Sequence, residues 1–417
     1  MIEKNKPKFF YGYIIVALAF LLMAVFWGTL YSFGVFFKPV LTEFGWTRAA
    51  TSGAFSLCFI LYGFSAMLAG RMNDRFGPRL VVTVTGLLCG LGYLLMSRID
   101  AIWQLYLYYG VILAMGTSGS YVPLSSMISR WFTRRRGVMM GIAVSGIGVG
   151  TLVMSPIANW LISSYGWRTS YIIVGLTALV LIVSAAQFLK RDPAEMGLSP
   201  YGEKEGKEPG GKIKGLPLGS VIATWNFWMV CLAFFCFGVA IQAILVHIVA
   251  HVTDIGISAT TAASVLAIIG GGGFAGRFVV GGVTDKTGGR MALLFSFAGL
   301  VVALFWLLFC RQAWMFFLFA VVFGLAYGAF STLIGLVVAE FFGVAALGVI
   351  LGAALLGTAL GEAFGALLPG YVFDVTGSYQ LAFIICTVLS VVGIGLSLLL
   401  KPVVPASSPQ SSSQRRS

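Results

Sequence analysis

Two ionisable side chains stand inside long apolar runs of the sequence, away from other charges. Arg277 lies in the stretch FAGRFVVGG, and Glu362 lies in GTALGEAFG. A charged group in such surroundings is costly, so its presence points to a function. The guanidinium is a planar fork of N–H donors that suits two-point binding of a carboxylate. Gly273 and Gly281, four residues to either side, leave room beside Arg277 on the same helical face. The spacing therefore predicts that Arg277 binds an anionic ligand.

Three side chains are candidates for exchanging protons. Apolar neighbours favour the neutral form of Glu362, so this carboxyl could take up a proton near neutral pH. His247 and His251 are four residues apart and share one helical face, with Asp254 one turn further on. Histidine changes its charge in the physiological pH range. Two alternatives remain open: Glu362 could hydrogen-bond between helices, and the histidines could form a polar edge at the membrane interface.

The ligand is expected to carry one negative charge. A dianion would need a second positive group to offset the loss of its hydration, and Arg277 is the only cation away from the loops. Tyrosine offers an apolar wall with one hydroxyl, which suits a small hydroxy acid. The expected lining of the site consists of aromatic and small polar residues at mid-depth: Tyr31, Ser118, Tyr121, Ser145, Phe323, Tyr327 and Ser331. Each of these residues could equally serve packing alone.

The elements that must position these side chains are membrane helices. Of the 417 residues, 59% are hydrophobic and 10% are charged, whereas an average soluble domain is roughly 25% charged. A helix needs about 20 apolar residues to cross a ~30 Å hydrocarbon core. Runs of that length lie near 11–37, 50–70, 80–97, 102–129, 138–163, 168–189, 221–247, 259–283, 291–310, 313–339, 345–370 and 380–400. The sequence predicts an all-α membrane protein with twelve transmembrane helices, and excludes a soluble enzyme.

The helices are expected to form two six-helix bundles, at 1–189 and 217–400. A polar cytoplasmic linker at 190–216 joins them, and a disordered tail follows at 401–417. A repeat supports this division, because one pattern returns at a single offset: Gly70, Asp74, Arg75, Gly77 and Arg79 correspond to Gly281, Asp285, Lys286, Gly288 and Arg290. Parallel halves of this kind suit alternating access about a site at the membrane midplane.

The net charge of +13 reflects topology. Most Lys and Arg residues fall in the loops of one side, which predicts a multi-pass protein of the cell membrane with both termini in the cytoplasm. These residues are expected to contact membrane lipids rather than nucleic acid. All six cysteines lie in or beside apolar runs and are interpreted as small hydrophobic residues. The sequence offers no metal cluster, cofactor motif or nucleophile–base pair, and we expect a monomer that is not an enzyme.

The stretch GRMNDRFGPR and its echo GGVTDKTGGR resemble the signature of the major facilitator superfamily. The resemblance covers nearly the whole chain and implies two bundles that rock about a central site. It also implies a conformational latch at the helix ends, formed by Asp74, Arg75, Arg79, Asp285 and Arg290. Carboxylates are favoured near helix N-termini, which makes such a latch plausible. In the alternative reading, these charges only solvate tight turns at Gly77 and Gly288.

A second stretch, WFTRRRGVMMGIAVSGIGVG at 131–150, is similar to a motif of monocarboxylate transporters and of the related oxalate–formate antiporters. Both families carry an arginine at the place of Arg277. The oxalate relatives add a lysine where Leu360 aligns, so the resemblance favours a lactate- or pyruvate-like monocarboxylate over oxalate. Animal monocarboxylate transporters have an aspartate at the place of Gly273 and a lysine at the place of Tyr31. Both residues usually assigned to proton coupling in that family are therefore missing here.

Together these features predict a secondary active transporter that moves a small monocarboxylate with protons by alternating access. Two alternatives remain: a proton-independent carboxylate antiporter of the oxalate–formate type, and a carboxylate sensor that binds its ligand without transporting it.

Overall fold

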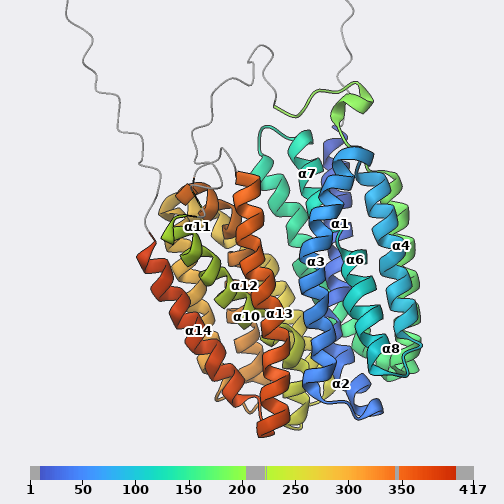
Figure 1. The fold of residues 1–417 in the computed structure, drawn as a ribbon, viewed down its shortest axis with the longest axis vertical. Helices are drawn as coiled ribbons and strands as arrows, with labels where there is room; N and C mark the ends of the chain where they lie inside the picture. Colours follow the sequence, from blue (N-terminus) through green and yellow to red (C-terminus); the bar gives the residue numbers. More distant parts are fainter. Residues whose placement is uncertain (1–9, 203–220, 222, 343–346, 401–417) are drawn as a thin grey trace, which may run out of the picture.

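The structure is a computed structural model that describes residues 10–202, 221, 223–342 and 347–400. Within these ranges, only the backbone is described for 279–287, 331, 332, 334–336, 339 and 347–353. The described chain forms two groups of helices that lie side by side, one from the first half of the sequence and one from the second (Figure 1). We call the side where α1 begins and α14 ends the terminal side, and the opposite side the far side.

In the first half, three of the long apolar stretches are single helices, and two are built from several shorter helices in a row. Thr47 caps one of these helices, because its side chain accepts a hydrogen bond from the backbone N–H of Ala50. The elements in chain order are α1 (Gly12–Tyr31), α2 (Phe33–Phe44), α3 (Arg48–Phe76), α4 (Pro78–Met96), α5 (Ile102–Leu105), the π-helix η1 (Tyr106–Ile112), α6 (Leu113–Thr117), α7 (Val122–Trp131), α8 (Arg136–Gln187) and the 3-10 helix η2 (Pro193–Met196).

The second half is built from fewer and longer helices. Side-chain caps at Thr224 and Ser258 begin the first two of them. The elements are α10 (Trp225–Asp254), α11 (Ala259–Leu307), α12 (Ala313–Phe342), α13 (Leu347–Thr376) and α14 (Gln380–Leu399).

Three tight turns between spanning segments share one backbone geometry. Gly77 has φ 83° and ψ 166°, and Gly288 has φ 79° and ψ 162°. Only glycine adopts this conformation readily, which explains why both copies of the sequence repeat carry a glycine there. Gly166, inside α8, has φ 75° and ψ 161° and makes a third turn of the same kind.

Two of the expected spanning helices are interrupted. The first is divided at Ser32 into α1 and α2, and the fourth contains η1 and a break between α6 and α7. Ser118 and Ser120 lie in that break, where irregular backbone is tolerated only if protein surrounds it. Both are buried, so the surrounding helices supply that protection.

The described chain contains eleven helical stretches long and apolar enough to cross a membrane. One of them, Arg136–Gln187, has 52 residues and is interrupted at Gly166, so it supplies two crossings. Many large apolar side chains, such as Phe64, Met67 and Trp103, are exposed, which is typical of a protein surrounded by lipid. The prediction of twelve spanning helices is confirmed, and the chain is a multi-pass membrane protein.

Glycines allow the two halves to approach each other at backbone distance. A Cβ added to Gly148 of α8 would lie 2.6 Å from the carbonyl oxygen of Gly270 of α11. A Cβ on Gly34 of α2 would lie 2.6 Å from the carbonyl oxygen of Leu245 of α10. Gly370 of α13 packs in the same way against the start of α3. Small residues at helix interfaces permit this close packing in membranes.

Candidate functional site

Arg277 lies on α11 and is buried, with 4% of its surface exposed. Its Nη1 donates a hydrogen bond to the carbonyl oxygen of Gly273, one turn earlier, at 3.1 Å. Its guanidinium carbon lies 5.6 Å from the centroid of the Tyr327 ring, within the range of a cation–π interaction. The side chain is therefore held inside the protein and does not extend to the membrane surface.

The guanidinium lies where the two halves meet. A Cβ added to Gly148, in the first half, would come within 2.9 Å of Arg277 Nη1. The same hypothetical atom would lie 2.7 Å from the backbone nitrogen of Phe274. The absence of a side chain at Gly148 thus leaves the space that the guanidinium occupies, and a group bound to Arg277 would be next to both halves.

Three of the predicted residues gather around Arg277. Tyr327 of α12 interacts through its side chain with Arg277 and with Tyr31 of α1. Glu362 of α13 lies within electrostatic range of both tyrosines. Its backbone packs on Gly238 of α10, where an added Cβ would lie 3.0 Å from the Glu362 nitrogen. One cation, one carboxyl and two phenols from both halves therefore form one cluster, which we call the central cluster.

Two more tyrosines belong to its surroundings. Tyr121 lies within electrostatic range of Arg277, which agrees with the expectation that it lines the site. Tyr62 of α3 lies within electrostatic range of Glu362, and it was not among the expected residues. A tyrosine at mid-depth in an apolar run, the signal that selected Tyr31, could also have selected Tyr62.

The other expected lining residues have different neighbours. The hydroxyls of Ser118 and Ser145 donate to carbonyl oxygens three residues earlier in the chain, those of Met115 and Ile142. Phe323 is fully buried, and its ring packs 5.3 Å from that of Phe319 on the same helix. The side chain of Ser331 lies outside the described residues.

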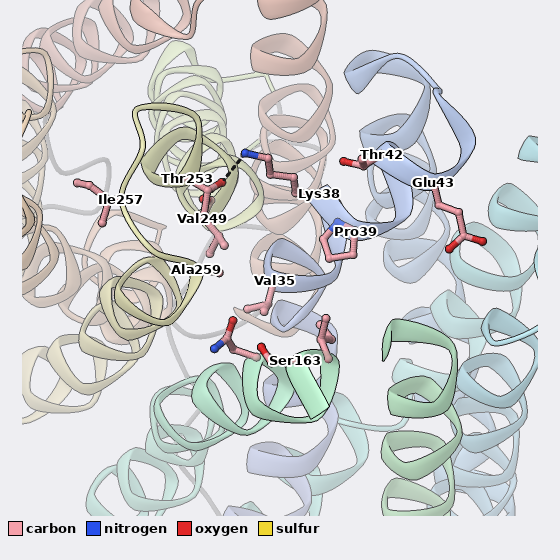
Figure 2. Close-up of a pocket in the computed structure, with 12 residues that line it drawn as sticks. Val35, Lys38, Pro39, Thr42, Glu43, Ser163, Val249, Thr253, Ile257 and Ala259 are labelled. Carbon is pink, nitrogen blue, oxygen red and sulfur yellow. Dashed lines mark hydrogen bonds between the residues drawn. The ribbon is translucent and has the colours of Figure 1, made fainter. Parts of the chain in front are cut away.

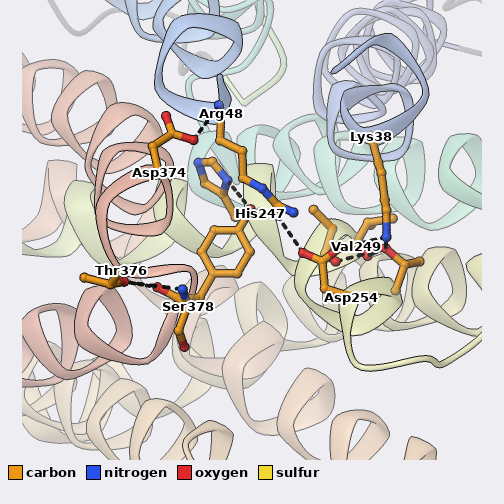
Figure 3. A network of polar contacts seen from close by, with 11 residues as sticks. Lys38, Arg48, His247, Val249, Asp254, Asp374, Thr376 and Ser378 are labelled. Carbon is orange, nitrogen blue, oxygen red and sulfur yellow. Dashed lines mark hydrogen bonds and ion pairs between the residues drawn. The ribbon is translucent and has the colours of Figure 1, made fainter. Parts of the chain in front are cut away.

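His247 and His251 lie near the far side, apart from the central cluster. There, ion pairs join the first half to the second (Figure 3). Asp254 accepts from Lys38 at 2.7 Å and from Arg48 at 2.6 Å. Asp374 accepts from the backbone N–H groups of Arg48 and Ala49. We call this set of contacts the far-side gate.

Most of the hydrogen bonds and ion pairs between described residues of the two halves lie toward the far side. They include the far-side gate, the bond from the Ser56 hydroxyl to the carbonyl oxygen of Ala363, and the bond from Asn159 to Thr260. In this conformation the halves are thus fastened together at the far side.

A cavity of about 570 Å³ lies beside the far-side gate (Figure 2). It lies between α2, α8, α10 and the start of α11, and its lining includes Lys38, Asn159 and Thr253. The Lys38 amine, which reaches Asp254, also donates to the Thr253 hydroxyl at 3.1 Å. Because its cation is already paired, the cavity offers no free positive group to an anion.

The expected latch residues lie on the terminal side. Asp74 is exposed and pairs with Arg130 of α7 at 3.2 Å, and Arg130 also contacts Asp192 at 3.3 Å. Arg75 and Arg79 are exposed. The Arg75 guanidinium lies over the ring of Phe76, at 5.1 Å. These contacts therefore lie within the first half and do not join it to the second.

In the second half, the side chain of Asp285 lies outside the described residues. Arg290 donates to the carbonyl oxygens of Ser397 and Leu398 at the end of α14. Glu340 accepts from the backbone N–H of Gly289 at 2.6 Å, so a carboxylate caps the helix that follows the Gly288 turn. Glu340 was not expected from the sequence.

The chain matches the family model described as Major Facilitator Superfamily over residues 16–311 and 230–417. It is 28% identical over 408 residues to Monocarboxylate transporter 13 of Bos taurus, covering 97% of this chain and 92% of that protein. It is 26% identical over 412 residues to Monocarboxylate transporter 11 of Homo sapiens, covering 96% and 85%.

Among solved structures, the chain is similar to a bacterial homologue of the human lysosomal transporter Spinster, in an inward-facing and unoccupied conformation. The TM-score is 0.70 at 16% identity, over 95% of each chain. This similarity shows the fold. Together with the family match and the full-length relatives, it places the chain in the Major Facilitator Superfamily, within its monocarboxylate transporter clade.

Proposed function

We propose that this protein carries a small monocarboxylate, similar to lactate or pyruvate, across the cell membrane together with a proton. The observation that carries the proposal is the buried guanidinium of Arg277 at the junction of the two halves. An ionisable group buried in the membrane is costly and is by default a candidate for function, and a guanidinium suits the binding of a carboxylate. The protein is thus proposed to act as a transporter and not as an enzyme.

The terminal side is proposed to be cytoplasmic, because the loops there hold most of the Lys and Arg residues. The far side is then external. On this assignment the conformation described above is closed to the outside by Lys38, Arg48, Asp254 and Asp374. The latch residues Asp74 and Arg130, which pair within the first half, would change partners when the cytoplasmic side closes.

Charge balance supports a single carboxylate and a single proton. A bound monocarboxylate would take the place of the Gly273 carbonyl and the Tyr327 ring as a partner of Arg277. The pair is then neutral, and protonated Glu362 is neutral as well. Closing the halves over a neutral cluster costs much less than closing them over a cluster with a net charge. Glu362 is assigned as the proton carrier because it lies in the central cluster, whereas both histidines lie away from it.

The proposal is tested by uptake into proteoliposomes with an imposed pH gradient. Lactate and pyruvate are expected to accumulate when the outside is acidic, whereas oxalate and the neutral amide of lactate are not. Exchange of carboxylates without any effect of pH would support the antiporter. Binding without flux would support the sensor. Equal flux of the neutral amide would contradict a carboxylate site.

The close approach of the halves at Gly148 gives a second test. In Gly148→Ala the added methyl would meet the backbone of Gly270 and Phe274 below 3.0 Å, so the halves must separate beside Arg277. We expect the initial rate of uptake to fall at least about tenfold. Gly141→Ala, on the same helix, has nothing within 4 Å of the added atom and should stay within about twofold of the wild type. Equal rates for the two variants would contradict this placement of Arg277.

A further inference from the structure

The far-side gate continues inward as a chain of hydrogen bonds that ends at a buried histidine. Arg48 Nη1 contacts the Tyr379 hydroxyl. That hydroxyl lies 3.3 Å from Nδ1 of His247, and Nε2 of His247 lies 2.8 Å from the carbonyl oxygen of Ala366. The His247 side chain is fully buried. Figure 3 shows His247 between Arg48 and the helix that carries Asp374.

The partners fix the protonation state of the ring. A carbonyl oxygen can only accept, so Nε2 must carry the hydrogen that bonds to Ala366. Arg48 can only donate, so the Tyr379 oxygen accepts from it, and the Tyr379 O–H is left to donate to Nδ1. With that O–H donated to it, Nδ1 accepts and carries no hydrogen. In the closed gate, His247 is therefore the neutral tautomer with its hydrogen on Nε2.

A second proton on His247 does not fit this arrangement. The new Nδ1–H could bond only if the Tyr379 O–H turned away, and one neutral phenol oxygen would then accept from two cations, the ring and the Arg48 guanidinium. A positive ring would also be buried near that cation without a carboxylate of its own. The acids nearby are engaged, Asp254 with Lys38 and Arg48 and Asp374 with two backbone N–H groups. Burying an unpaired charge is strongly unfavourable.

The elements packed around His247 bring no free carboxylate to offset the charge among the residues that the structure describes. Phe37 of α2 contributes only a ring, at 5.1 Å. His251 lies one turn further along α10, where its ring packs against Phe383 at 5.0 Å. The titratable and charged groups that face His247 from these elements are His251 and Asp254 of α10, Arg48 of α3, Asp374 of α13 and Tyr379 at the start of α14.

We propose that the far-side gate is a proton lock that closes only when His247 is neutral. The inference rests on the proposed function for its direction, since the far side is taken as external. External acid then favours the outward-open state, in which His247 is released from Tyr379 and can take up a proton. The gate closes again once the proton has left His247.

A proton released from His247 has an acceptor on the side of the central cluster. Ala366, which accepts from His247 in the closed gate, lies four residues after Glu362 on α13. This spacing separates the two levels by about 6 Å along the helix axis. A proton that leaves His247 toward the central cluster would therefore meet Glu362, which links closure of the gate to loading of the proposed carrier.

The lock is tested without substrate, by measuring the distance between spin labels on the external ends of the two halves. Asp100→Cys and Val375→Cys supply exposed positions, one in each half. The native cysteines are buried or half-buried, and the protein without added cysteines gives their background. In lipid nanodiscs, the ratio of closed to open gate should fall as the pH is lowered from 8 to 5, by up to about tenfold per pH unit for one proton.

Two matched variants identify the sensor. His247→Gln keeps a donor for Ala366 but cannot gain a proton, so its gate should remain closed across the pH range. His251→Gln changes the neighbouring histidine and should retain the response of the wild type. A gate insensitive to pH in the wild type would overturn the lock. So would a response that survives in His247→Gln or disappears only in His251→Gln.

Failure of the lock is distinguishable from failure of the proposed function. If the gate does not respond to pH but the protein still accumulates lactate with protons, only the proposed proton lock is contradicted. If the gate responds to pH but the protein carries no carboxylate, only the proposed transport function is contradicted.

Discussion

Arg277→Gln is expected to lower the initial rate of lactate uptake into proteoliposomes at least about 100-fold. The substitution removes the positive charge that a buried carboxylate requires. Each charge-assisted hydrogen bond contributes about 1.5–3 kcal/mol, and losing about 3 kcal/mol corresponds to about a 100-fold change. Arg277 also contacts Gly273 and Tyr327, so the amount of folded protein must be matched by size-exclusion chromatography before rates are compared.

Two further variants separate the charge from the shape of the side chain. Arg277→Lys keeps the charge but loses the planar fork, and we expect an intermediate rate. Arg98→Gln removes an exposed arginine outside the central cluster and should leave uptake within about twofold of the wild type. Uptake by Arg277→Gln within threefold of the wild type would show that the substrate is held elsewhere.

Glu362→Gln is expected to abolish accumulation driven by a pH gradient while exchange of carboxylate across the membrane continues. The glutamine is permanently neutral, so it resembles the protonated carrier and allows the halves to rock with substrate, but it cannot release a proton inside. One proton per carboxylate supplies about 1.4 kcal/mol per pH unit, a tenfold concentration ratio that the variant should lose entirely.

The measurement compares lactate accumulation with lactate counterflow in the same vesicles. Glu195→Gln changes an exposed glutamate of η2 and serves as the control, with both activities expected to be normal. If Glu362→Gln still accumulates lactate along the pH gradient, Glu362 is not the proton carrier.

The spanning segments could be predicted because each must bury about 20 apolar residues in hydrocarbon, which leaves a plain signal in composition. The turns at Gly77 and Gly288 were visible through the repeat. The equivalent turn at Gly166 was not, since no copy of the motif surrounds it, although its backbone geometry is the same. The π-helix η1 and the division at Ser32 are local departures that tertiary packing imposes on otherwise continuous apolar runs.

For the central cluster, the sequence predicted the residues but not their arrangement. Arg277, Tyr31, Tyr327 and Glu362 were selected separately, as polar groups at mid-depth on four different spans. The structure places them together, while their roles stay predictions. Tyr62 carries the same signal as Tyr31, a tyrosine at mid-depth in an apolar run, and that signal alone does not distinguish a site from packing.

The far-side gate could not be predicted at all. Arg48 was read only as one of the few basic loop residues on its side, and Asp374 carried no motif. Their pairing depends on how the ends of α3 and α13 meet. Contacts between residues so far apart in the chain produce no recognisable spacing pattern in a single sequence. The distribution of charges along the chain predicts topology, whereas the partners of those charges depend on tertiary structure.

The most direct measurement is the binding of lactate to the purified protein by isothermal titration calorimetry, with the wild type and Arg277→Gln side by side. The account predicts saturable binding of lactate to the wild type, no detectable binding to Arg277→Gln, and no binding of the neutral lactate amide to either protein. Equal affinity of both proteins for lactate, or equal affinity of the wild type for lactate and its amide, would contradict the claim that Arg277 holds the carboxylate.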